Sequence, residues 1–317
     1  MRRRDVLGWL GGAAVYPLQA RAQARTPLVG GLILTNPEPY WSYLREALRA
    51  GGYEDGRTIR LDLRSAEGNA AALAAYCAEL VRARADVIVA VQTAPIRAAM
   101  AASIEIPIVM IAGAPVETGL IRSLSRPGGN VTGVSTTVAE LAAKTLESMG
   151  AVLPGLRRVA VLVNAADQDF GKSMLGQIEG AARSLKIDVR AFTIRRVDEL
   201  ETAFSSMVED GAQAVIVQPS LPRPRVLELA LKHRVPAIAS NLGWAEAGAL
   251  LCYAPDLRDV CRKAAGYVDR LLKGGKPADM PVEQPTVFEL AINLRTAKAL
   301  GIEVPPMVLG SATQVFE

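Results

Sequence analysis

Short apolar runs alternate with helical hydrophobic patterns along most of the chain. The runs are apolar throughout, as is typical of parallel strands that are buried on both faces. Segments with apolar residues at helical spacing separate most of them. Strand-like runs occupy 28–34, 58–64, 86–92, 106–112, 130–135, 157–163, 188–194, 212–218 and 235–240, and helical patterns occupy 69–84, 137–150, 170–185 and 222–233. The alternation predicts an α/β protein with parallel sheets.

A turn-rich stretch divides these runs into two groups. Residues 125–133, with the sequence SRPGGNVTG, contain a proline and two glycines, and a fresh series of strands and helices begins at Arg157. So many strands are unusual for one sheet. We therefore expect two doubly wound sheets of similar size, one from each half of the chain.

The final third of the chain breaks this rhythm. A strand-like run at 249–255 leads into a long helical pattern at 256–277, which two glycines and a proline end. A further strand and a final helix follow. Such an isolated helix and strand can complete sheets begun earlier, so we expect the chain to cross between the two lobes more than once. The apolar residues on one face of the long helix are Val260, Ala264, Tyr267, Val268 and Leu271.

The first 24 residues have the layout of a secretory signal peptide. Three arginines at 2–4 precede an apolar stretch at 6–18, and a cleavage pattern of small residues follows at 20–22. The apolar stretch is too short to cross a hydrocarbon core of about 30 Å as a helix. Paired arginines followed by Asp-Val-Leu loosely match a twin-arginine signal. We predict a signal peptide at 1–24 and a periplasmic location, reached by the twin-arginine or the general route, with an uncleaved anchor as the alternative.

The leader carries most of the net charge. Its four arginines and one aspartate account for +3 of the formal +4 of the whole chain, which leaves the mature protein near +1. The basic character therefore does not indicate a surface for nucleic acid or membrane. We expect no nucleic-acid partner.

Three cysteines and a single histidine limit the metal and redox chemistry. Cys252 and Cys261 could pair in an oxidising compartment. We favour three reduced core residues, including Cys77, because the count is odd and buried cysteines pack as small apolar residues. The chain has no C-x-x-C motif, and one histidine is too few for the common zinc sites. We predict no metal and no cofactor.

No catalytic constellation stands out. The chain has no G-x-G-x-x-G after its first strand and no G-x-S-x-G, and GGNVTG is followed by Val-Ser instead of the Lys-Ser/Thr of a phosphate-binding loop. His233 lies between two basic residues at a predicted helix end, where a cation complements the helix dipole. We interpret it as a surface residue. We predict no catalytic residue and no enzyme; a periplasmic enzyme that depends on His233 is the weakest alternative.

The carboxyl ends of the predicted strands carry amides, hydroxyls and small residues. Ligands of open α/β sheets bind beyond these ends, and such groups hold a small polar molecule without activating a nucleophile. Thr93 opens a helix, which favours a ligand carboxylate there, with Asn164 and Gln218 supplying polar contacts from the other half. The predicted ligand-binding residues are Thr35, Asn36, Tyr40, Gln92, Thr93, Ala94, Gly113, Asn164, Gln218, Ser220, Asn241, Trp244 and Tyr253.

Aromatic residues gather after the first strand. Trp41 shares a helical stripe with Leu44 and Leu48, which indicates a core residue. Tyr40 lies nearer the strand end and faces the expected cleft, where it could stack on a flat ligand. Trp244 either closes the cleft from the opposite half or covers the core of that half.

Four segments carry a resemblance to a known family: ADVIVAVQTAP, SLSRPGGNVTG, LPGLRRVAVLVN and the block from Lys273 to Leu300. They resemble the bacterial ABC transporter substrate-binding family that includes tryptophan- and tyrosine-binding proteins. The resemblance runs from about Leu28 to the end. It implies a type I periplasmic-binding fold, with two α/β lobes, three crossover strands and the ligand in the cleft. Mapped onto this sequence, lobe one comprises 28–135 plus 255–280, and lobe two comprises 137–250 plus 284–317.

The resemblance implies an exported, monomeric receptor that delivers a small ligand to an ABC permease in the inner membrane. A sensory protein that presents its closed form to a membrane receptor is the alternative. Two departures stand out: Ala114 replaces the usual aspartate before Pro-Val, and the chain ends ATQVFE instead of ADEVIE. An aromatic amino acid is the implied ligand, and other small carboxylates or amides stay open.

Overall fold

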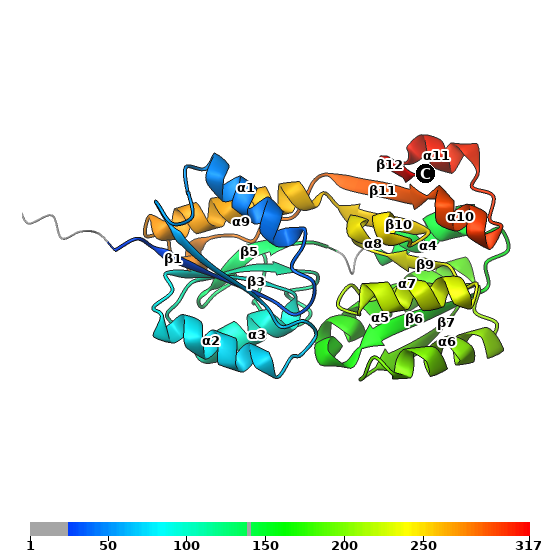
Figure 1. The fold of residues 1–317 in the computed structure, drawn as a ribbon, viewed down its shortest axis with the longest axis horizontal. Coiled ribbons are helices and arrows are strands. Elements are labelled where there is room, and N and C mark those ends of the chain that lie inside the picture. Colours follow the sequence, from blue (N-terminus) through cyan, green and yellow to red (C-terminus); the bar gives the residue numbers. More distant parts are fainter. Residues whose placement is uncertain (1–24, 138–140) are drawn as a thin grey trace, which may run out of the picture.

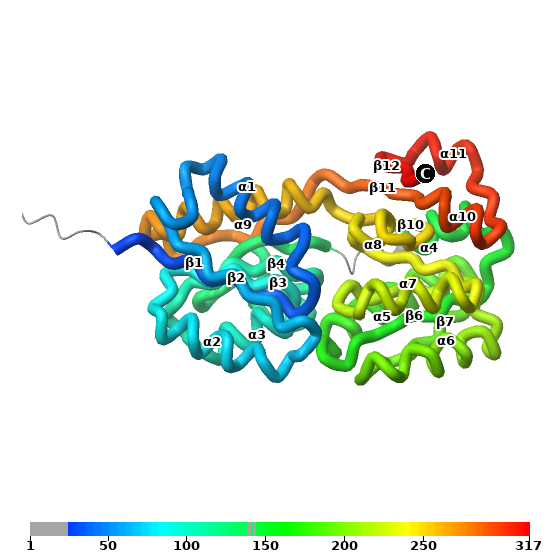
Figure 2. The backbone as a smooth tube through the Cα atoms, viewed as in Figure 1, coloured from blue at the N-terminus to red at the C-terminus, as the bar shows by residue number. Residues whose placement is uncertain are grey.

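The computed structural model describes residues 25–137 and 141–317, which form two α/β lobes side by side (Figure 1). The predicted signal peptide at 1–24 lies outside the described residues. Figure 2 shows that neither lobe is a continuous stretch of sequence, because late segments return to each of them. The predicted α/β class with two sheets is confirmed. Within the described residues, no helix is long and apolar enough to cross a membrane.

Lobe one contains a five-stranded sheet in the order β2-β1-β3-β4-β5, and every neighbouring pair is parallel. Helices α1 and α9 pack on one face, and α2 and α3 pack on the other (Figure 1). Because both faces are covered, β1, β3, β4 and β5 are buried along their whole length, which accounts for their apolar sequences. The bounds are β1 (Leu28–Ile33), α1 (Tyr40–Ala50), β2 (Arg60–Ser65), α2 (Ala72–Arg82), β3 (Val87–Val91), α3 (Thr93–Ala102), β4 (Ile108–Ala112), β5 (Val131–Ser135) and α9 (Leu257–Leu272).

Lobe two contains a seven-stranded sheet in the order β12-β11-β10-β9-β8-β6-β7. Helices α4, α5, α10 and α11 pack on one face, and α6, α7 and α8 pack on the other. The bounds are α4 (Ala142–Val152), β6 (Arg158–Asn164), η1 (Ala165–Asp167), α5 (Gln168–Leu185), β7 (Asp188–Ile194), α6 (Glu199–Glu209), β8 (Ala214–Val217), α7 (Arg223–Lys232), β9 (Ala237–Ala239), α8 (Leu242–Ala247), β10 (Leu251–Pro255), β11 (Phe288–Asn293), α10 (Leu294–Leu300), α11 (Pro306–Ser311) and β12 (Gln314–Phe316). The short helix η2 (Pro277–Asp279) instead contacts β5 of lobe one.

One strand pair departs from the predicted parallel pattern. Strands β10 and β11 are antiparallel. The cause is the path of the chain, since β10 carries it out of lobe two towards α9, and β11 brings it back. A strand that enters the same sheet from the opposite end must run in the opposite direction.

The chain passes between the lobes three times, after β5, after β10 and before β11. The first and third passages run side by side, because Ser135 N donates to Glu283 O at 2.9 Å and Glu283 N donates to Gly133 O at 3.0 Å. The hydroxyl of Tyr267, on α9, donates to the carbonyl of Pro281 in the third passage. Helix α9 itself packs against α1. The late helix therefore completes lobe one, which explains why it interrupted the alternation in the sequence.

The three cysteines are buried and free, as predicted. Cys252 lies in β10 and Cys261 lies in α9, so the strand-to-helix turn that joins these elements does not bring the two sulfur atoms into a bond. Burial raises the pKa of the Cys77 thiol to about 11 and that of Cys252 to about 12. All three thiols are therefore inert core groups.

Candidate functional site between the lobes

The carboxyl ends of the strands in each lobe are fixed by a glutamine at an equivalent position. Gln92 follows β3 in lobe one, and Gln218 follows β8 in lobe two. Leu34 N donates to Gln92 Oε1 at 3.1 Å, and Asn164 N donates to Gln218 Oε1 at 2.9 Å. The amide nitrogen of Gln218 also donates to the carbonyl of Asp167 at 3.1 Å. Gln92 thus holds the carboxyl ends of β1 and β3 together, and Gln218 holds those of β6 and β8 together.

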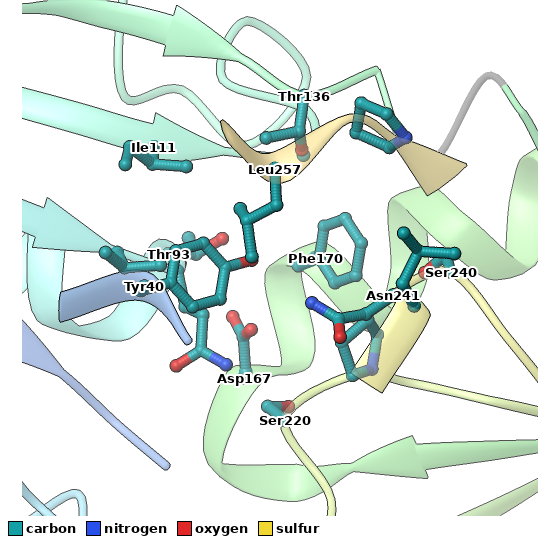
Figure 3. Close-up of a pocket in the computed structure, with 16 residues that line it drawn as sticks. Tyr40, Thr93, Ile111, Thr136, Asp167, Phe170, Ser220, Ser240, Asn241 and Leu257 are labelled. Atoms are coloured by element: carbon teal, nitrogen blue, oxygen red, sulfur yellow. The ribbon is translucent and has the colours of Figure 1, made fainter. Parts of the chain in front are cut away.

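A pocket lies between these two sets of strand ends, and we call it the inner pocket (Figure 3). It encloses about 670 Å³ of empty space, part of it open to solvent. Figure 3 shows Tyr40, Phe170 and Leu257 around one part of it and Asp167 and Ser220 at the other. The lining residues are Tyr40, Val91, Gln92, Thr93, Ile111, Gly113, Thr136, Asp167, Phe170, Pro219, Ser220, Ser240, Asn241, Leu242, Pro255 and Leu257.

Among the described residues that line this pocket, Asp167 is the one with a charged side chain. Asp167 is 5% exposed, and its Oδ1 has no hydrogen-bond partner among the described residues. Oγ1 of Thr93, across the cleft on lobe one, is also buried without a hydrogen-bond partner among the described residues. Burial raises the pKa of Asp167 to about 6, although the Thr93 and Gln218 side chains favour its charged form. A buried carboxylate oxygen without a partner costs free energy, and an ammonium group bound there would offset that cost.

Small residues allow the two lobes to touch beside the pocket. A Cβ atom at Gly113, after β4, would lie 2.2 Å from Cε2 of Phe170 on α5. Ala114 is 1% exposed and belongs to the same apolar cluster as Phe170. At the rim, Arg97 Nη2 lies 2.8 Å from Asp169 Oδ2. These contacts define a closed form, in which Ala114 contributes to the apolar seal between the lobes.

The structure brings ten of the thirteen predicted site residues to the cleft. Some line the inner pocket, and others line an adjoining space that we call the outer chamber. The first group is Tyr40, Gln92, Thr93, Gly113, Ser220 and Asn241, and the second group is Thr35, Asn36, Asn164 and Trp244. Trp244 is nevertheless 3% exposed and packs mainly in the core of lobe two.

The other three predicted residues line neither space. Gln218 is fully buried and acts through its hydrogen bonds to the Asn164 and Asp167 backbone. Ala94 packs with the small apolar cluster around Leu34. Tyr253 stacks on Phe288 of the neighbouring strand, with 6.2 Å between ring centroids.

Several lining residues escaped the sequence prediction. Asp167 and Phe170 lie in the turn and helix after β6, and Leu257 begins α9 after the second passage between the lobes. The position of Asp167 at a strand end was a usable signal. Phe170 and Leu257 gave none, because they meet the site only when two distant parts of the chain pack together.

Outside the pocket, Trp41 and His233 match their predictions to different degrees. Trp41 is 3% exposed and lies in the core of lobe one, as predicted. The guanidinium of Arg258 lies over the ring of Tyr43, with 4.1 Å between Arg258 Cζ and the ring centroid. His233 is less exposed than predicted, because its ring stacks on Phe204 and its Nε2 lies 3.0 Å from Glu201 Oε1.

Asp167 gives the ligand-free protein a measurable pH dependence. Its pKa of about 6 exceeds the ordinary value of 3.8. Between these two values the unfolded chain has released its proton and the folded chain keeps it, so the free energy of unfolding falls as pH rises. We expect Asp167→Asn to remove this fall. At neutral pH, the free energy of unfolding of the variant should exceed that of the wild type by at most roughly 3 kcal/mol. Urea unfolding of both proteins across this range tests the expectation, and parallel pH curves would contradict it.

Two α/β lobes joined by three passages, with a pocket between their strand ends, define a two-lobe ligand-binding protein. The sequence matches the profile of the ABC transporter substrate binding protein family over residues 40–316. The chain therefore belongs to this family, as the resemblance of its motifs implied. It is the substrate-binding protein of an ABC transporter, which implies a small-molecule ligand and a permease partner.

Individual relatives share both sequence and shape with this chain. A tyrosine-binding protein of Clostridioides difficile (strain R20291) is 31% identical over 264 residues, which cover 81% of this chain and 75% of the relative. The ABC domain in complex with L-Trp from Streptococcus pneumonia has a TM-score of 0.84 at 25% identity, and covers 92% of this chain and 100% of its own. A conserved domain protein from Vibrio cholerae has a TM-score of 0.85 at 24% identity, with the same coverage.

A further relative shares the fold. The ligand-free, open structure of a substrate binding protein with adhesive properties from Clostridium difficile has a TM-score of 0.66 at 24% identity, over 92% of this chain and 99% of its own.

Proposed function

We propose that this chain is an exported receptor that captures an aromatic amino acid and delivers it to an ABC importer. The observation that carries the proposal is the buried carboxylate of Asp167, whose Oδ1 has no hydrogen-bond partner among the described residues, beside an apolar pocket with aromatic walls. The names of two relatives, a tyrosine-binding protein and a complex with L-Trp, support the same ligand class.

The charges of the site favour one orientation of the ligand. Asp167 lies on lobe two and meets Thr93 and the start of α3 on lobe one. A ligand carboxylate at Thr93, as the sequence suggested, would face a buried like charge. We therefore place the ammonium group of the ligand at Asp167, where it can also donate a hydrogen bond to the Thr93 hydroxyl oxygen. The aromatic side chain then lies among Tyr40, Phe170 and Leu257.

The wider role follows from the family and from the leader. We place the mature protein in the periplasm after removal of 1–24, by the twin-arginine or the general route, as a monomer without enzymatic activity. The lobe limits are those given by the resemblance, 28–135 plus 255–280 and 137–250 plus 284–317. The family and its permease partner support transport as the purpose of binding.

Calorimetric titration tests the ligand class. Protein freed of ligand is titrated with L-tyrosine, L-tryptophan and L-phenylalanine, and with L-leucine and L-lysine as controls. We expect at least one aromatic amino acid to bind roughly two- to tenfold more tightly than leucine, because stacking adds about 0.5–1.5 kcal/mol to apolar burial. Tyr40→Ala should weaken the aromatic ligand and leave a weak aliphatic one unchanged. Equal affinity for leucine and the aromatic amino acids would refute the proposal.

A further inference from the structure

The inner pocket leaves half of a zwitterionic ligand without a charged partner. Asp167 can hold an ammonium group, but the part of the chain that the structure describes lends no lysine, arginine or histidine to the lining of this pocket. An amino acid also carries a carboxylate, and burying it without a strong donor is costly. If the proposed function holds, a cation is needed within reach of the inner pocket.

The outer chamber supplies candidates for that cation. It encloses about 1390 Å³ of empty space, part of it open to solvent, and shares Tyr40, Gln92, Ser220 and Asn241 with the inner pocket. Its lobe-two wall carries Arg195, Arg196 and Arg223. A ligand in the inner pocket can therefore extend a polar group into a basic space without leaving the cleft.

Arg223 differs from the other two arginines. Arg195 and Arg196 are exposed, and Arg196 already pairs with Asp198 at 2.7 Å. Arg223 begins α7 and is half-buried, and its guanidinium has no hydrogen bond or ion pair with any residue that the structure describes. It also borders a groove on the outside of lobe two, yet neither glutamate of that groove, Glu228 or Glu246, pairs with it.

Gly243 lies beside Arg223 and leaves room at the cleft for the guanidinium of Arg223. A Cβ atom at Gly243, on α8, would lie 2.5 Å from Arg223 Nη1 and 3.2 Å from Asn241 Oδ1. The guanidinium thus lies in the space of a missing side chain, close to Asn241, which lines both the inner pocket and the outer chamber. A half-buried guanidinium without a partner is well suited to bind a carboxylate through two parallel hydrogen bonds.

We propose that Arg223 binds the carboxylate of the amino acid whose ammonium group Asp167 holds. The ligand lies across the boundary between the two spaces, with its side chain in the inner pocket and its acid group in the outer chamber. Both charged contacts then come from lobe two. This assignment rests on the proposed function and adds a residue that determines specificity for acids over amines.

The test compares L-tyrosine with tyramine, which lacks the carboxylate, by calorimetry on the full chain. We expect the wild type to prefer L-tyrosine by about ten- to a hundredfold, and Arg223→Gln to bind the two equally. Gly243→Ala keeps the charge but displaces the guanidinium, so it should lose much of the preference. Arg195→Gln is the matched control from the same chamber and should keep it.

The outcomes separate this inference from the proposed function. A wild type that binds neither these two compounds nor L-tryptophan or L-phenylalanine overturns both. A wild type that prefers L-tyrosine, together with an Arg223→Gln variant that keeps the full preference, overturns the role of Arg223 alone. Loss of the preference in Thr93→Ala but not in Arg223→Gln would move the carboxylate to the start of α3, against the assignment made here.

Discussion

Asp167→Asn is expected to lose roughly thirtyfold or more of the affinity for an aromatic amino acid, with the loss reaching several thousandfold if the ion pair is fully enclosed. The asparagine keeps the shape of the side chain but removes the charge that the ammonium group needs. Oδ1 of this carboxylate is buried without a partner among the described residues, and none of the other described residues that line the inner pocket is charged, so none of them replaces it. Titration calorimetry with L-tyrosine and L-tryptophan at pH 7.5 measures the loss.

The same variant distinguishes a binding role from a structural one. Because burial raises the pKa of Asp167 to about 6, the charge destabilises the empty fold, and Asp167→Asn should be at least as stable as the wild type. A structural carboxylate would give the opposite result. Asp188→Asn, at the exposed start of β7, makes the same change in net charge and should bind normally. An Asp167→Asn protein with unchanged affinity would remove the basis of the proposed ligand orientation.

Much of the fold follows from local sequence pattern. The stretch 28–34 is apolar at every position because β1 is covered by helices on both faces, and this pattern is visible without any tertiary information. The antiparallel β10–β11 pair, the short strand β12 and the helix α11 depend on how the chain returns from α9. Direction in a sheet is set by the path between strands, which residue periodicity does not encode.

The residues of the candidate site, like the elements of the fold, could be predicted from the sequence only in part. Gln92 and Asn241 could be predicted because parallel strands bring their carboxyl ends to one edge of the sheet. Which residue of a strand end turns inward is decided by the local turn, so Asp167 lines the pocket while Asp169, two residues later, pairs with Arg97 at the rim. Phe170 joins the site through contact between lobes, and that contact depends on closure.

Gly113→Val is expected to prevent the lobes from closing and so to lower affinity by roughly ten- to a hundredfold. Overpacking of this kind costs about 1–3 kcal/mol, and the cost falls on the closed form alone. The new Cβ would lie 2.2 Å from the ring of Phe170, which is 6% exposed and has little room to move. In an open form the two residues separate, so each lobe should still fold. Small-angle scattering with saturating L-tyrosine should show no fall in the radius of gyration, in contrast to the wild type.

Two variants identify the clash as the cause. Gly176→Val makes the same substitution on α5 at a site where a Cβ meets nothing within 4 Å, and it should close normally. Adding Phe170→Ala to Gly113→Val removes the ring and should restore ligand-induced compaction, although the affinity for an aromatic ligand stays low because Phe170 lines the pocket. If Gly113→Val compacts on binding as the wild type does, the contact between Gly113 and Phe170 is not what limits closure, and the closed form must be reached by a different approach of the lobes.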